Sequence, residues 1–252
     1  MHRTVTREEW IAERRALLTE EKELTRRRDA LAEKRRALPW VAVDERYEFD
    51  GPQGRVTLAD LFEGSSQLFV QHVMQGPNQA LQCVGCALGV DHLESLLPHL
   101  QNHDVTVVAI ARAPLPELTA LRQRMGWRTP FYSSFGSEFN YDYGVSFKPA
   151  ALATGRVLYN YRECDPGIED IAGNSVFFKD DAGAVFHTYS NYARGGEDFL
   201  GIYRILEATP KGRNETGPHF SLVDWIRPHN MYGRGGEVAG NGRFTPPHSC
   251  CT

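Results

Sequence analysis

The sequence predicts an α/β fold with one mixed sheet flanked by helices, and two observations lead to this class. First, strand-like apolar runs alternate with helix-like stretches from residue 68 to residue 125, and a hairpin and a further helix follow. A β-α-β-α-β-β-α order requires parallel and antiparallel strands in one sheet. Second, Cys83-Val84-Gly85-Cys86 lies between the first of these strands and the helix after it. A chain of 252 residues, 41% of them hydrophobic, can bury one large core and still carry appendages.

The first predicted element is a charged helix over residues 7–36. Thr6 followed by Glu9 is a capping-box pattern, eighteen of these thirty residues are charged, and Pro39 ends the helix. One apolar seam recurs every seven residues, at Trp10, Leu17, Leu24, Leu31 and Leu38. So narrow a stripe predicts that the helix packs along an edge of the body or against a second copy, and we expect a homodimer.

Short strands and turns follow this helix. Tyr47 to Phe49 and Val56 to Leu58 flank a turn rich in glycine and proline, which predicts a hairpin. Residues 68–73 form an apolar strand that ends before the cysteine pair, and residues 87–99 have a helical pattern. Val105 to Ala111 is a continuous run of β-branched and small residues, as expected of a strand covered on both faces.

The predicted sheet is completed by a hairpin. Leu115 to Met125 reads as a helix that ends at Gly126. Residues 175–178 and 185–189 flank an Asp-Asp-Ala-Gly turn and form the hairpin, and residues 197–208 form the last helix. We therefore expect three parts: a charged helical arm (1–39), an α/β domain (40–232) and a flexible Gly-rich tail (233–252) that ends in Cys-Cys.

The charge distribution and the motifs exclude several functions. The chain has a net charge of −4, and residues 1–36 carry eleven basic against eight acidic residues, so the body is acidic and nucleic acid is not an expected partner. The sequence has no P-loop, G-x-G-x-x-G, G-x-S-x-G or H-E-x-x-H motif. No apolar run is long enough to span a membrane and no secretory leader is visible, so no membrane partner is expected and the cytoplasm is the expected compartment.

The C-x-x-C pair carries the main functional prediction. Five cysteines are too few for a disulfide framework, and in a reducing compartment they favour catalysis or metal binding. A thiol at a helix N-terminus meets unpaired backbone N–H groups and the positive end of the helix dipole, which favour the reactive thiolate. We therefore expect an exposed Cys83 to attack a disulfide and Cys86 to resolve the mixed disulfide. The alternative without chemistry is a buried structural pair.

Several long motifs resemble a known family. They are TPFYSSFGSEFNYDYGVSF (129–147), GNSVFFKDDAGAVFHTYSNYARG (173–195), YRILEATPKGRNE (203–215) and FSLVDWIRPHNMYG (220–233). These segments resemble the DUF899 family, whose members are described as predicted thioredoxin-like dithiol-disulfide oxidoreductases. The resemblance implies a thioredoxin-like fold in its larger, peroxiredoxin-like form. It also implies thiol–disulfide oxidoreductase activity at Cys83 and Cys86, with a thiol or disulfide substrate or redox partner and no required cofactor.

One position departs from the pattern that this resemblance implies. Thioredoxin-like oxidoreductases have a cis-proline just before the hairpin strand, beside the dithiol. Here Asn174 holds that position, and none of the seven residues before it is a proline. Pro130, after Thr129, takes the role only if the strand order is different.

A metal site is the alternative chemistry. His72 ends the strand that leads to the cysteines and His187 lies in the hairpin, so both are candidates to join Cys83 and Cys86. Thiolate and imidazole ligands suit copper or zinc, and some thioredoxin-like copper proteins use two cysteines and one histidine on the fold that the resemblance implies. A third alternative is a non-catalytic, dimeric interaction module in which the cysteines are structural.

Further residues are candidates for a substrate pocket or an electron relay. The pocket candidates are aromatic or polar residues in two of the motifs, namely Tyr132, Tyr141, Asp142, Asn174, Tyr189 and Arg194. Cys250 and Cys251, beside His248, form a vicinal pair that is a candidate resolving or metal-relay dithiol. Cys164 is expected to be a bystander.

Overall fold

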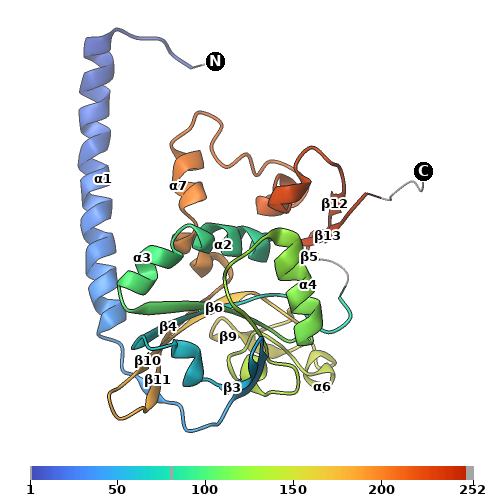
Figure 1. Ribbon diagram of the computed structural model, residues 1–252. Coiled ribbons are helices and arrows are strands. Elements are labelled where there is room, and N and C mark those ends of the chain that lie inside the picture. The colour runs from blue at the N-terminus through green and yellow to red at the C-terminus, as the bar shows by residue number, and fades with distance from the viewer. Residues whose placement is uncertain (1, 80–81, 248–252) are drawn as a thin grey trace. The chain divides into compact units, whose positions relative to one another are not determined.

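The computed structural model describes residues 2–79 and 82–247, which divide after Trp40 into two compact units (Figure 1). The first unit is the single helix α1 (Arg7–Arg36). Its N-cap is the predicted capping box, because the Thr6 hydroxyl accepts from Glu9 N and the Glu9 carboxylate accepts from Thr6 N. No residue of α1 is buried, and the five apolar residues of its seam are 45–50% exposed.

The second unit contains one eight-stranded mixed sheet. Its strands follow the order β1-β11-β10-β4-β6-β7-β2-β3. The bounds are β1 (Val41–Ala42), β2 (Glu48–Gly51), β3 (Gly54–Thr57), β4 (Gln67–His72), β6 (Val105–Ala111), β7 (Phe131–Ser133), β10 (Gly173–Lys179) and β11 (Val185–Tyr192). β4, β6 and β7 are parallel, whereas β10 and β11 run antiparallel to their neighbours. A helix that starts at the cysteine pair links β4 to β6, so the predicted thioredoxin-like α/β class is confirmed.

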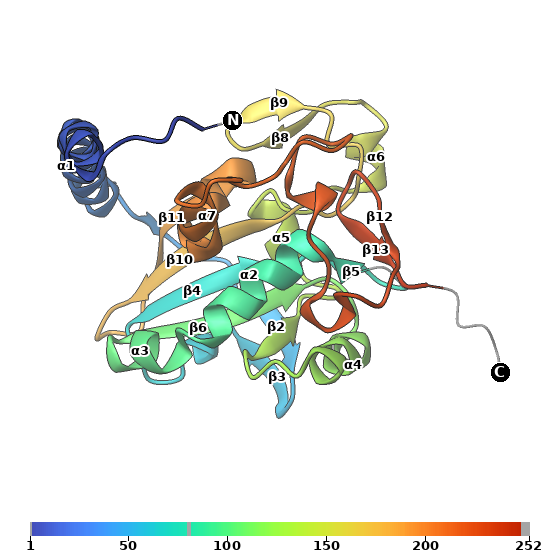
Figure 2. The ribbon, with the colours of Figure 1, turned by 90° about the horizontal axis from the view of Figure 1, so that it is seen from above.

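Helices cover one face of this sheet. Figures 1 and 2 show α2 (Val84–Glu94), α3 (Leu97–Asn102) and α4 (Leu115–Met125) on the same side. Strand β6 alternates between two cores: Ala109 and Ala111 pack with both cysteines and α4, whereas Val108 and Ile110 pack against the opposite cluster with Phe139. The cysteine pair therefore belongs to the core beneath α2 and α4.

The remaining elements of this unit are η1 (Asp60–Phe62), α5 (Phe139–Asp142), α6 (Pro149–Leu152), β8 (Val157–Tyr159), β9 (Arg162–Cys164), η2 (Ala193–Phe199) and α7 (Gly201–Glu207). η2 and α7 lie on the same side of the sheet as α2 (Figure 1). The predicted helix over 197–208 is thus a 3-10 segment followed by the short helix α7. No helix in the described ranges has the length and apolar character needed to cross a membrane.

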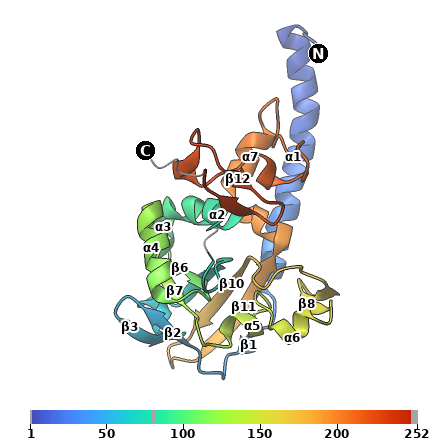
Figure 3. The ribbon, with the colours of Figure 1, turned by 90° about the vertical axis from the view of Figure 1, so that its right-hand side faces the viewer.

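Residues 217–247, named here the C-terminal segment, pack against α2. The segment contains η3 (Leu222–Asp224), η4 (His229–Met231), β12 (Glu237–Val238) and β13 (Arg243–Thr245), and Figures 2 and 3 show it beside α2. β13 pairs with β5 (Gln82–Cys83), and Phe244 is buried with Val84 and Ile226. The expectation of a flexible tail from residue 233 is therefore wrong up to residue 247, because Phe244 and the strand pairing order it.

Candidate functional site

Cys83 is the N-cap residue of α2. Its backbone is extended, and its sulfur accepts a hydrogen bond from Cys86 N at 3.4 Å. Cys86 lies in the first turn of the same helix, and its own sulfur accepts from Met74 N at 3.4 Å. The N–H groups of the first helical turn have no partners within the helix, and here the N–H of Cys86 donates to the sulfur of Cys83 instead.

The two thiols have opposite acidities. The hydrogen bond from Cys86, the backbone N–H groups of Cys86 and Gly85, and the positive charge of Arg243 lower the pKa of Cys83 to about 7, against the opposing effect of burial. The hydrogen bond to Cys83, burial and the charge on Cys83 raise the pKa of Cys86 well above its ordinary value. These effects favour a thiolate on Cys83 over a thiolate on Cys86.

The C-terminal segment covers Cys83. Arg243 lies opposite Cys83 in the β13–β5 pairing, and Val84 N donates to Gly242 O at 2.9 Å. A Cβ atom at Gly242 would lie 3.6 Å from the Cys83 sulfur, which is an ordinary contact distance, so the backbone there lies against the thiol, and its φ of +83° is the reason that glycine suits the position. Cys83 is only 5% exposed, in contrast to the exposed attacking thiolate that the sequence predicts.

Buried polar contacts fix the loop that precedes β5. The Arg243 guanidinium donates to Met74 O at 2.8 Å, and the Met74 sulfur lies 3.5 Å from that of Cys83. Further along the loop, Gln79 donates to Asp170, which is held by two hydrogen bonds from Arg112 of 2.7 and 2.8 Å. The loop and the C-terminal segment thus hold Cys83 from two sides.

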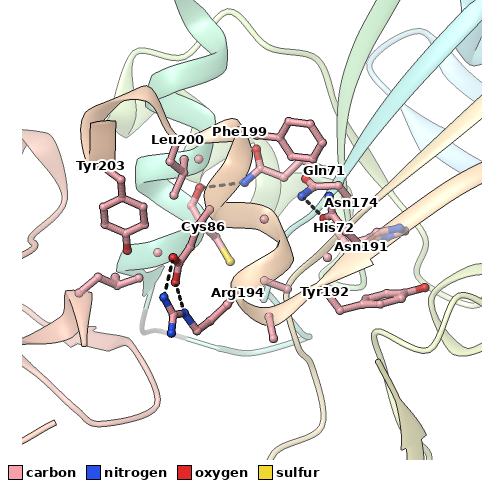
Figure 4. A pocket seen from close by; sticks show the side chains of 18 of the residues that line it. Gln71, His72, Cys86, Asn174, Asn191, Tyr192, Arg194, Phe199, Leu200 and Tyr203 are labelled. Carbon is pink, nitrogen blue, oxygen red and sulfur yellow. Dashed lines mark hydrogen bonds and ion pairs between the residues drawn. The ribbon is translucent and has the colours of Figure 1, made fainter. Parts of the chain in front are cut away.

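Cys86, unlike Cys83, lines a pocket of about 660 Å³ (Figure 4). The pocket lies between α2, the β4–β10–β11 part of the sheet, η2, α7 and the C-terminal segment. Its apolar walls include Phe69, Leu93, Phe199, Leu200, Tyr203 and Leu222. A volume of this size is typical of sites for small organic molecules.

Two buried polar side chains of this pocket each have an atom without a hydrogen-bond partner. Gln71 donates to Cys86 O at 3.0 Å, which leaves its Oε1 unbonded. Asn191 accepts from Asn174 at 2.9 Å, which leaves its Nδ2 unbonded. Gln71 is 7% exposed and Asn191 is 6% exposed. His72 Nδ1 is also unbonded, but the His72 ring packs against Phe139 and Tyr143 on the opposite face of the sheet. Unpartnered polar atoms are rare in protein interiors, so Gln71 Oε1 and Asn191 Nδ2 are available to a bound molecule.

The two predicted histidine ligands are bonded to serines instead. His72 Nε2 contacts Ser175 Oγ at 2.8 Å, Ser175 contacts Ser190 at the same distance, and Ser190 contacts His187 Nε2 at 2.7 Å. In the described part of the chain, no three His, Cys, Asp or Glu side chains are grouped so that they could hold a metal ion. The predicted set of Cys83, Cys86, His72 and His187 therefore does not come together.

Two of the six predicted pocket residues, Asn174 and Arg194, line this pocket. The others lie elsewhere. Tyr132 packs in the opposite core and donates to Glu63. Tyr141 accepts a hydrogen bond from Arg112, and Asp142 accepts one from Tyr47. Tyr189 pairs with Val176 in the hairpin. These four residues contribute to the fold and not to the pocket.

The remaining sequence predictions are placed as follows. Asn174 lies in β10, and Pro130 precedes β7, which β6 separates from β4, so Pro130 does not take the place beside the dithiol. Cys164 is a free, half-buried thiol in β9. Cys250 and Cys251 lie outside the described residues.

The sequence did not identify Gln71 or Arg243. Gln71 has a weak signal, because it is a polar residue within the predicted strand over residues 68–73, which leads to the cysteine pair. Arg243 has none: it lies in a glycine-rich stretch, and only the β13–β5 pairing brings it to Cys83.

Comparisons with known proteins add the following. The model of the family DUF899, described as "Bacterial protein of unknown function (DUF899)", matches residues 1–232. No curated protein matches the chain.

Similar solved structures include Peroxidoxin BcpB from Mycobacterium tuberculosis, which is 12% identical with a TM-score of 0.43; the match covers 66% of this chain and 96% of that chain. A mutant of Peroxiredoxin Q from Xanthomonas campestris is 10% identical with a TM-score of 0.40, and the match covers 63% of this chain and 90% of that chain. A putative thiol:disulfide interchange protein DsbE from Chlorobium tepidum is 12% identical with a TM-score of 0.40, and the match covers 66% of this chain and 94% of that chain. Similarity at this level does not carry an activity from one chain to another.

Proposed function

We propose that this chain, which belongs to the DUF899 family, is a thiol–disulfide oxidoreductase that acts through the Cys83/Cys86 dithiol. The family match over residues 1–232 confirms the membership that the motifs predict. The family description names no activity, so the function rests on the site.

The unequal stabilisation of the two thiols carries this proposal. Cys83 accepts hydrogen bonds from backbone N–H groups and lies near the charge of Arg243, whereas the hydrogen bond to Cys83 keeps the proton on Cys86; both thiols are buried. Two structural thiols in a core gain nothing from such an arrangement. A dithiol that stabilises one thiolate has a good leaving group when its disulfide is opened.

The overall reaction is an exchange of disulfides. The protein disulfide accepts two electrons from two substrate thiols, so that the substrate disulfide forms and both cysteines are released as one thiolate and one thiol. The reverse reaction reduces a substrate disulfide. Each step exchanges one S–S bond for another and needs no cofactor.

A redox titration of the purified full-length chain tests the proposal. The chain is equilibrated in mixtures of reduced and oxidised dithiothreitol and, for the less reducing range, of reduced and oxidised glutathione, and free thiols are then alkylated and mapped by mass spectrometry. We expect Cys83 and Cys86 to lose their thiols together and to regain them reversibly. Cys83→Ser and Cys86→Ser should each abolish this transition, whereas the matched control Cys164→Ser should leave its midpoint unchanged.

Two results contradict the proposal. One is a pair that stays reduced over the whole range of mixtures. The other is one copper or zinc ion per purified chain that is lost in either cysteine variant, because this would support the metal site that the sequence predicts as an alternative.

We further propose that α1 pairs with the α1 of a second copy. The helix has four exposed apolar residues at intervals of seven, Leu38 continues the repeat just after its end, and none of the five is buried. A seven-residue apolar repeat is the pattern by which two helices pack side by side. A second copy offers a seam of the same length and spacing.

The relay role of Cys250 and Cys251 stays a prediction. Arg243 lies opposite Cys83, and the chain from Arg243 to Cys250 is seven residues long. Such a length spans at most about 24 Å. A variant that ends before His248 should keep the Cys83/Cys86 transition and lose only electron transfer that passes through the vicinal pair.

A further inference from the structure

We infer that the pocket beside Cys86 binds a small, uncharged thiol or disulfide that carries an amide group, and that the substrate forms its mixed disulfide with Cys86. This inference rests on the proposed function and names the substrate class and the sulfur at which exchange occurs. It reverses the roles that the sequence predicts for the two cysteines.

The two sulfurs have different surroundings. Both cysteines are buried, Cys83 at 5% and Cys86 at 3% exposed, but Cys86 and Gly85 line the pocket, whereas Cys83 is not among its lining residues. Cys83 is instead enclosed by Met74, by the backbone at Gly242 and by strand β13. A molecule that enters the pocket therefore meets Cys86 first (Figure 4).

The unpartnered polar atoms define the ligand's polar group. Gln71 Oε1 is an acceptor without a donor, and Asn191 Nδ2 is a donor without an acceptor. An amide has one N–H donor and one C=O acceptor and complements both. The amide of Gln71 donates to Cys86 O at 3.0 Å, so a ligand group bound to Gln71 lies next to the turn of α2 that carries Cys86.

Charges at the pocket favour an uncharged ligand. Arg194 forms an ion pair of 2.9 Å with Glu197, which also binds Arg213 at 2.8 Å. Glu215 is the remaining charged lining residue. Arg194 is thus already neutralised, and a carboxylate ligand would gain little from it. The apolar walls suit the carbon chain of a neutral molecule.

The chemistry follows from this placement. A substrate thiolate RS⁻ attacks Cys86 Sγ of the Cys83–Cys86 disulfide, the S–S bond breaks, and Cys83 leaves as a thiolate. A second substrate thiolate then attacks the substrate sulfur of the Cys86 mixed disulfide. This step releases RSSR and a Cys86 thiolate, which takes up a proton. Backbone N–H groups and Arg243 already stabilise the leaving sulfur.

Four thiols test the substrate class on the oxidised full-length chain. Pantetheine is uncharged and has two amides, 2-mercaptoethanol is uncharged without an amide, glutathione has amides and carboxylates, and reduced insulin B chain represents a polypeptide. The opening rate of the protein disulfide is measured for each and divided by the concentration of thiolate present. We expect pantetheine to react at least about ten-fold faster than each of the other three, because about two hydrogen bonds are gained.

Substitutions test the binding atoms. Gln71→Met and Asn191→Leu remove the amide partners at nearly constant volume and should each lower the pantetheine rate about five-fold, with little change for 2-mercaptoethanol. Gln67→Met is the matched control, because Gln67 lies on the same strand β4 and bonds Asp104 O, away from the pocket. It should change neither rate.

A trapping experiment identifies the reacting sulfur. Cys83→Ser and Cys86→Ser chains are incubated with pantethine, the disulfide of pantetheine, and peptides are mapped by mass spectrometry. We expect the mixed disulfide on Cys86 of the first variant and labelling of Cys83 in the second that is slower by about ten-fold or more, because Cys83 lies outside the pocket.

The outcomes separate this inference from the proposed function. If the redox titration shows no reversible Cys83–Cys86 disulfide, the proposed function fails. If that disulfide forms but pantethine labels Cys83 faster, or 2-mercaptoethanol or the B chain reacts as fast as pantetheine, only the present inference is overturned.

Discussion

Cys83 and Cys86 are three residues apart but differ in what surrounds their sulfur atoms. The N–H groups of the first helical turn and Arg243 face Cys83, whereas Cys86 faces the pocket. The C-x-x-C spacing and its place at a helix start could be predicted from the sequence. The difference between the sulfurs could not, because Arg243 is far from the pair in the chain.

The charge of Arg243 gives a first prediction at the residue scale. Alkylation of Cys83 by iodoacetamide should rise with pH and reach half its maximum near pH 7, because the thiolate is the reactive form and the pKa of Cys83 is lowered to about 7. Arg243→Gln should move this midpoint upward by roughly one unit. Arg243→Lys keeps the charge and is the control, so a midpoint shifted equally in both variants would contradict a charge effect.

Burial of His72 gives a second prediction, for stability. Burial, followed by the nearby His187, lowers the pKa of His72 to about 3. The unfolded chain binds a proton near pH 6.5 that the folded chain does not bind until about pH 3, so this contribution to stability is present above pH 6.5 and is lost as the pH falls toward 3. The free energy of unfolding should fall by up to about 1.4 kcal/mol per pH unit in this window.

Urea unfolding at pH 7, 6 and 5 measures this loss. His72→Gln keeps a polar group near Ser175 but does not titrate, so its unfolding free energy should vary less with pH than that of the wild type. Part of the slope should remain, because burial also lowers the pKa of His187. An identical pH dependence in the variant and the wild type would show that His72 is not responsible.

At the scale of elements, local sequence signals located most of the sheet and its helices. The predicted bounds of α1, β6 and α4 match the structure, because capping residues, a β-branched run and a terminal glycine mark them. The single helix expected over 87–99 is two helices, since Pro98 lies at the second position of α3 and cannot continue the helix before it. β7 has only three residues, too few to show the alternation of apolar and polar side chains that marks a strand, so the sequence does not predict it.

The contact between β13 and β5 gives a third prediction. Phe244 is 5% exposed and packs with Val84, Val223 and Ile226, so Phe244→Ala should loosen β13. Alkylation of Cys83 should then become about ten-fold faster, with a smaller change at Cys86. Tyr232→Ala, in the same segment but at a residue 52% exposed, is the control and should leave the rate unchanged. Equal rates in the Phe244 variant and the wild type would show that β13 does not limit access.

The seam of α1 gives a fourth prediction. Replacing Leu17, Leu24 and Leu31 by Glu should convert a dimer to a monomer in size-exclusion chromatography with light scattering, because three apolar contacts per helix are lost. Three substitutions at exposed charged positions of the same helix, Glu20→Gln, Arg27→Gln and Lys34→Gln, serve as the control. A wild-type chain that elutes as a monomer at high concentration would contradict the pairing.

At the scale of the whole molecule, the site is assembled from distant parts of the chain. Strand β4 supplies Gln71, the start of α2 supplies both cysteines, β11 supplies Asn191, and β13 supplies Arg243. Each local pattern predicts its own element. The pocket depends on pairings between elements far apart in sequence, which local patterns do not specify. For this reason the sequence identifies the dithiol but not most of the pocket.

The C-terminal segment makes the surroundings of Cys83 adjustable from a distant part of the chain. The family model matches residues 1–232, whereas Gly242 and Arg243, which lie against Cys83, come later in the chain. Substitutions in this later stretch can therefore change the charge and the backbone contacts at the Cys83 sulfur while the Cys-x-x-Cys motif stays the same. They would shift the pKa of the thiol, on which the reduction potential of a dithiol depends.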